Sequence, residues 1–193
     1  LISLLAATVL AGATQADALV VLAEGVPVSH NPDGATSSVV TNWVGWNNML
    51  EPLVYFPKGE VGAGGVQLYK FGEFEGRLAE SWSYDPATLT WTFNLRKDVK
   101  GCDGATFNAD DVVYTFARAK SISGSAPIGW FLASTGSVDG FTPAVFAPDE
   151  SGAAARKLGD EVKKIDDYTV QIRQSAPNQL FLKVLSIFAL YIF

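Results

Sequence analysis

The sequence has very few of the residues that build disulfides, metal sites and most catalytic centres. Its 193 residues include one cysteine, Cys102, and one histidine, His30. One cysteine cannot form an internal disulfide, and one histidine leaves no second imidazole for a histidine-based metal site. The CxxC, HExxH, GxSxG and P-loop patterns do not occur. No motif therefore supports a redox, metalloprotease, serine hydrolase or nucleotide-binding function.

Basic residues are also scarce. There are 14 Lys and Arg against 20 Asp and Glu, which gives a net charge of −6. This balance argues against a nucleic-acid or anionic-membrane surface, since both need clustered positive charge. With 48% hydrophobic and 18% charged residues, the composition is that of an ordinary globular protein with ample material for a core.

The N-terminal residues predict an export signal. Residues 1–13 form an apolar run that is followed by small residues, with possible cleavage frames ending at Ala13 or Ala18. The run is too short to span a membrane. No Lys or Arg precedes Lys58, so we expect the basic start of the signal to be missing. No cysteine lies near the cleavage region, which disfavours a lipid anchor and favours a Gram-negative periplasm. We predict a truncated signal peptide over residues 1–18.

Residues 78–116 carry the strongest local pattern. Around the Asp85–Pro86 turn, two short stretches alternate apolar and polar residues, which predicts a β-hairpin. Asp103–Gly104 predicts a tight turn, because glycine adopts positive φ without steric penalty. Asn108 is a good helix N-cap, and acidic residues follow it in the first turn, where the helix dipole favours anions.

This hairpin, turn and helix resemble the family 5 solute-binding proteins, which serve ABC importers of peptides and nickel. The shared motifs are "LAESW" (78–82), "TFNLR" (92–96), the "VKGCDG" turn (99–104) and "FNADDVVYTF" (107–116). The chain departs from the family at Cys102, where histidine is usual. "EPLV" (51–54) and "EVKKIDDYTVQI" (161–172) extend the resemblance, most closely to the dipeptide-binding branch.

The resemblance implies an α/β fold, namely a lobe of a type II periplasmic binding protein with mixed β-sheets and flanking helices. It implies a core sheet of lobe I from residues 19–53 and 159–193, with an inserted subdomain of hairpins and helices over 54–158. Family members are considerably longer, so we expect the second lobe to be absent from this chain. For that reason we also expect the chain to bind ligand poorly on its own.

Several further elements are predicted from pattern. Residues 19–24 read as a buried strand and 36–50 as a helix. A glycine-rich connection at 59–65 and a strand at 66–71 suggest a second hairpin, and residues 161–173 suggest a third. Residues 180–193 are strongly apolar. We favour a core helix running into a core strand over a membrane anchor, because the run is short and contains Lys183.

Ligand contacts come from the resemblance alone. It places Glu24, Gly25 and Val26 on the rim of the ligand cleft, where a free strand edge could pair with a peptide backbone. Trp130 lies where a second contact region begins. The alternatives are a solvent-exposed strand end for Glu24 and a core aromatic for Trp130.

The resemblance implies a binding protein without a catalytic step or a cofactor. Its cargo would be a dipeptide or oligopeptide, passed to an ABC permease by a monomeric receptor, with nickel or another small solute as the alternative cargo. Two other classes stay open, a surface interaction module and a secreted thiol hydrolase that uses Cys102 with His30. We expect Cys102 to be a small packing residue, and we expect the acidic pairs at 110–111 and 166–167 to serve helix caps and turns.

Overall fold

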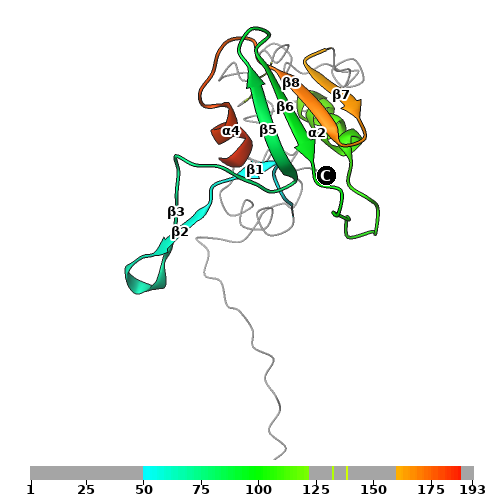
Figure 1. The fold of residues 1–193 in the computed structure, drawn as a ribbon. Helices are drawn as coiled ribbons and strands as arrows, with labels where there is room; N and C mark the ends of the chain where they lie inside the picture. Colours follow the sequence, from blue (N-terminus) through cyan, green and yellow to red (C-terminus); the bar gives the residue numbers. More distant parts are fainter. Residues whose placement is uncertain (1–49, 122–131, 133–137, 139–159, 188–193) are drawn as a thin grey trace, which may run out of the picture.

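The computed structural model describes residues 50–121, 132, 138 and 160–187 of the chain (Figure 1). The described residues include eight short strands, two α-helices and one 3-10 helix. The elements in chain order are β1 (Val54–Tyr55), β2 (Lys58–Val61), the 3-10 helix η1 (Ala63–Gly65), β3 (Gln67–Tyr69), β4 (Glu75–Gly76), β5 (Ala79–Asp85), β6 (Thr90–Leu95), α2 (Ala109–Ser121), β7 (Val162–Asp166), β8 (Thr169–Arg173) and α4 (Phe181–Ile187).

A four-stranded antiparallel sheet, in the order β5-β6-β8-β7, is the centre of the described fold (Figure 1). The predicted hairpin supplies β5 and β6, in which Trp82 lies opposite Phe93. The hairpin predicted at 161–173 supplies β7 and β8, and β8 pairs with β6 so that Phe93 also lies opposite Val170. Both predicted hairpins are therefore confirmed, and they combine into one sheet.

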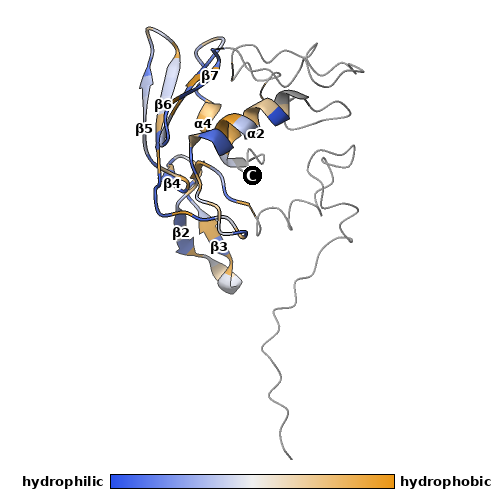
Figure 2. Ribbon diagram, turned by 90° about the vertical axis from the view of Figure 1, so that its right-hand side faces the viewer, coloured by the Kyte–Doolittle hydropathy of each residue, from blue (hydrophilic) through white to orange (hydrophobic). Residues whose placement is uncertain are grey.

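One face of this sheet is apolar and covered. Phe93, Val170 and Ile172 have no exposed surface, as expected for alternate positions on adjacent strands. Phe181 of α4 packs on this face, with ring centroids 5.5 Å from Trp91 and 6.4 Å from Phe93. Helix α2 lies on the same side of the sheet (Figure 2). The two helices and the sheet thus enclose the hydrophobic core of the described part.

The opposite face is polar. The side chain of Gln171 donates a hydrogen bond to the Thr92 hydroxyl at 3.2 Å, and the Asn94 amide donates to the Ser81 hydroxyl at 2.9 Å. These side chains alternate with the apolar set along β5, β6 and β8. A one-residue shift in register would bury them and expose the core residues, so the alternation fixes the pairing.

Strands β2 and β3 form a hairpin that extends from the body next to the β1–β4 pair (Figure 1). The hairpin was predicted, but residues 59–61, which were predicted to belong to its connection, are part of β2. Gly64 and Gly65 have φ of 73° and 78° in its turn. Its base is anchored by aromatic contacts, among them Phe56 against Phe71 at 5.0 Å. The hairpin carries exposed apolar side chains at Val61 in β2, at Val66 just before β3 and at Leu68 in β3, and exposed Phe71 follows soon after. Strand β3 is orange in Figure 2.

The C-terminal prediction is confirmed where the structure describes it. Residues of the apolar run form α4, in which Phe181 and Leu185 are buried. Residues 188–193 lie outside the described part. Within the described residues, no helix has the length and apolar character needed to cross a membrane.

Several predictions fall outside the described residues, namely the signal peptide at 1–18, the strand at 19–24 and most of the helix at 36–50. The predicted division of the chain placed 54–158 and 159–193 in different bodies. In the described part, β6 from the first segment and β8 from the second are neighbours in one sheet. The division into a lobe I core sheet from residues 19–53 and 159–193 and an inserted subdomain over 54–158 stays a prediction.

Candidate functional site

The turn at 101–104 is held by its own backbone. The N–H of Gly101 donates to the carbonyl of Ala105 at 2.8 Å, and the N–H of Gly104 donates to the carbonyl of Gly101 at 2.9 Å. Asp103 Oδ1 accepts a hydrogen bond from the N–H of Ala105 at 2.9 Å. Gly104 has a φ of 86°, the conformation that favours glycine. The predicted Asp–Gly turn is confirmed.

Helix α2 begins as predicted. Asn108 Oδ1 accepts a hydrogen bond from the N–H of Asp110 at 2.7 Å, and Asp111 Oδ2 accepts one from the N–H of Asn108 at 2.8 Å. This reciprocal arrangement is a capping box with Asp in the place of Glu. On the inner side of the helix, Val112 and Phe116 have no exposed surface.

Lys164 forms ion pairs with both the start of α2 and the β7–β8 turn. Its Nζ lies 2.8 Å from Asp110 Oδ2 and 2.9 Å from Asp167 Oδ1. Hydrogen bonds to Asp110 and then Asp167 raise the pKa of Lys164. The N–H of Ala109 also donates to the carbonyl of Asp167 at 2.8 Å. Asp110 and Asp111 have different partners, and each holds the start of α2 in place, as predicted.

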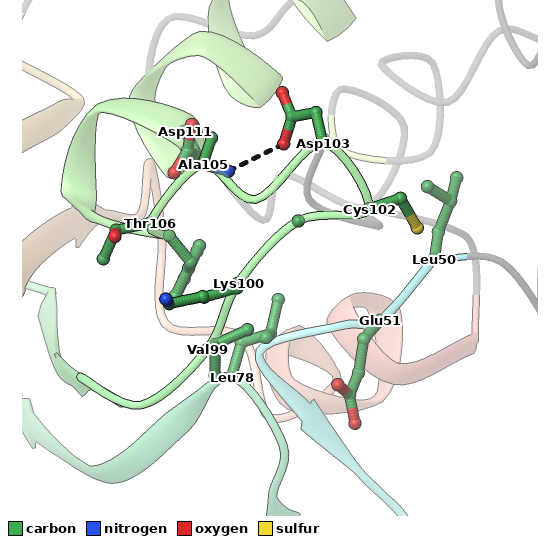
Figure 3. A pocket seen from close by; sticks show the side chains of 12 residues that line it. Leu50, Glu51, Leu78, Val99, Lys100, Cys102, Asp103, Ala105, Thr106 and Asp111 are labelled. Carbon is green, nitrogen blue, oxygen red and sulfur yellow. Dashed lines mark hydrogen bonds between the residues drawn. The ribbon is translucent and has the colours of Figure 1, made fainter.

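A cavity of about 600 Å³ lies between the turn and the segment that leads into β1 (Figure 3). Buried Leu78 and Phe107 form part of its wall. Its polar lining includes three carboxylates and one ammonium group, and Asp103 and Asp111 are already hydrogen-bonded within the fold. The lining residues are Leu50, Glu51, Leu78, Val99, Lys100, Gly101, Cys102, Asp103, Ala105, Thr106, Phe107 and Asp111.

Cys102 lines this cavity and is exposed. The expectation that it is a small packing residue is therefore wrong: the Gly101–Gly104 turn presents its side chain at the surface, with the sulfur directed toward Leu50 in Figure 3. The other titratable residues of the lining are Glu51, Lys100, Asp103 and Asp111. Within the described part of the chain, the lining therefore contains no histidine that could act as a base for the thiol. His30, the proposed partner of the thiol, lies outside the described residues.

The predicted ligand contacts Glu24, Gly25, Val26 and Trp130 all lie outside the described residues, so they stay predictions. Among the residues that the structure describes, no group of three or more His, Cys, Asp and Glu side chains is placed to hold a metal ion. Sequence reasoning did not find the cavity, because its walls come from segments that only the tertiary fold brings together.

The fold defines a class of protein. The chain superposes on the oligopeptide-binding protein OppA of Haemophilus influenzae, solved with the peptide RPPGFSPFR, with a TM-score of 0.60 at 24% identity. That match covers 80% of this chain and 26% of OppA. It also superposes on DppA of Helicobacter pylori in complex with the peptide STSA, with a TM-score of 0.55 over 82% of this chain and 27% of DppA, at 23% identity. The described part of the chain therefore has the fold of part of a lobe of the type II periplasmic binding proteins, which confirms the predicted fold class.

The sequence places the chain more narrowly. Residues 73–193 match the model of bacterial extracellular solute-binding proteins, family 5 Middle, and the chain belongs to this family. It is 33% identical to the dipeptide-binding protein of Escherichia coli over 94% of its own length, and 35% identical to the Escherichia coli oligopeptide-binding protein OppA over 56% of its length. It spans 30% of the first relative and 18% of the second. The resemblance drawn from residues 78–116 is thereby confirmed.

Proposed function

We propose that this chain is part of the periplasmic substrate-binding component of an ABC importer, and that the cargo is a dipeptide or oligopeptide. Family membership carries the proposal. In its support, the relatives reported above are named for binding dipeptides and oligopeptides, and both solved structures hold a peptide. The intact receptor acts as a monomer in the periplasm, delivers peptide to the permease and catalyses no reaction.

The contacts follow from the way extended peptides are recognised. A strand edge that offers backbone N–H and C=O groups can pair with the backbone of many peptides, so affinity depends little on peptide sequence. In our proposal, residues 24–26 supply this edge, and Gly25 allows close approach because it lacks a Cβ. Trp130 supplies an apolar surface for a ligand side chain. Closure of two lobes around the ligand completes the site.

A different cargo is the second candidate, because one relative departs from peptides. The chain is 31% identical, over 67% of its length, to heme-binding protein A of Haemophilus influenzae. One relative of this chain is therefore named for a non-peptide ligand. Nickel and other small solutes belong to the same alternative, and each can be tested beside peptides.

The test is ligand-induced thermal stabilisation of the full-length protein. A ligand that binds only the folded state stabilises it by about 2.7 kcal/mol at a concentration of 100 Kd. Dipeptides, oligopeptides, Ni²⁺ and heme are compared at equal concentrations, and we expect peptides to raise the melting temperature most. Stabilisation by heme or Ni²⁺ alone would move the assignment to the second candidate. If no ligand has an effect, a surface interaction module becomes the better description.

Two variants test the contacts. Gly25→Val adds a branched side chain where the peptide backbone approaches, and Trp130→Ala removes the apolar surface, so both should weaken peptide binding measured by calorimetry. Tyr114→Ala, at an exposed position of α2, is the matched control for loss of an aromatic ring. Unchanged affinity in both variants, with the fold intact by circular dichroism, would remove residues 24–26 and Trp130 from the site.

The thiol hydrolase is tested separately. We expect Cys102→Ser and alkylation of Cys102 to leave peptide binding unchanged, because the thiol lies on an exposed turn. Peptides are incubated with the wild-type protein, and products are followed by mass spectrometry. Peptide turnover that disappears in Cys102→Ser would establish the hydrolase.

A further inference from the structure

We draw no further inference here: the strongest candidate, the cavity between residues 50–51 and the loop at 99–107, offers an acidic rim and a lone thiol, and no second observation in the described part of the chain points to a ligand that it would bind.

Discussion

Asp111 accepts a hydrogen bond from the backbone N–H of Asn108, the residue whose own side chain caps the same helix. Each side chain satisfies an N–H that the first turn of α2 would otherwise leave without a partner. The capped end is also the point where Lys164 joins α2 to the β7–β8 turn. The start of α2 therefore fixes the helix against the sheet.

Replacing the N-cap residue Asn108 should lower the free energy of unfolding. Asn108→Ala removes the acceptor for the N–H of Asp110, and we expect the free energy of unfolding to fall by about 1 kcal/mol. Asn108→Ser is the matched control, because serine is an equally good N-cap residue. Both are measured by urea unfolding. Equal stability of the alanine and serine variants would mean that the cap contributes nothing.

Gly104 offers a test of backbone strain without steric overlap. Its φ is 86°, and a Cβ added there would meet nothing within 4 Å. Gly104→Ala should therefore destabilise the protein by about 1–2 kcal/mol through φ alone. Gly72→Ala is the control, since its Cβ would also meet nothing and its φ is not positive. That variant should be neutral or slightly more stable. Thermal unfolding separates the two, and equal melting temperatures would contradict the strain argument.

Much of this fold could be predicted from local signals. Alternation predicted β5, β6 and β8, and the Asp–Gly turn and the N-cap of α2 depend on residues close in sequence. The pairing of Phe93 with Val170 was not predicted, because it joins strands far apart in the chain and neither strand specifies its neighbour. Strand β4 was missed as well. It has two residues and exists only because β1 pairs with it.

Two residues show where local reasoning failed. Leu89 has a φ of 55°, which leucine rarely adopts. The residue type at position 89 therefore did not predict a left-handed backbone conformation. Its carbonyl accepts a hydrogen bond from the N–H of Gln174, a contact that supports this conformation from outside the hairpin. Cys102 was expected to be a small packing residue, because lone cysteines are usually buried. It is exposed, because it lies in the Gly101–Gly104 turn.

The carboxylates of Asp85 and Asp166, which lie in the hairpin turns, should make the stability of the fold depend on pH. Hydrogen bonds from the Thr88 hydroxyl and then the N–H of Ala87 lower the pKa of Asp85, and the N–H of Tyr168 does the same for Asp166. A lowered pKa in the folded state means that this stabilisation is present above 3.8, the ordinary value, and is lost as the pH falls through the folded value. We expect urea midpoints to fall as the pH drops below 3.8.

Thr88→Val removes the largest of the contributions that lower the pKa of Asp85. It removes the hydroxyl that donates to Asp85 at 2.7 Å and keeps the carboxylate, so the loss of stability in acid should become shallower. Thr106→Val, in the exposed loop before α2, is the control for replacing a threonine. If Thr88→Val and wild type lose stability in parallel as the pH falls, the hydroxyl does not set the pKa of Asp85.

Replacing Tyr84 with phenylalanine should stabilise the folded protein. Its ring lies 4.8 Å from that of Trp91 on the neighbouring strand, and its Oη is buried without a hydrogen-bond partner in the described part of the chain. A buried hydroxyl without a partner costs about 1–3 kcal/mol of desolvation, while the ring itself contributes packing. Tyr84→Phe keeps the ring and removes the hydroxyl, so we expect the free energy of unfolding to rise by about 1 kcal/mol. Tyr114→Phe, at a side chain that is 59% exposed, should leave stability unchanged. Urea unfolding of both variants decides the point, because a loss of stability in Tyr84→Phe alone would show that the hydroxyl is bonded in the folded protein.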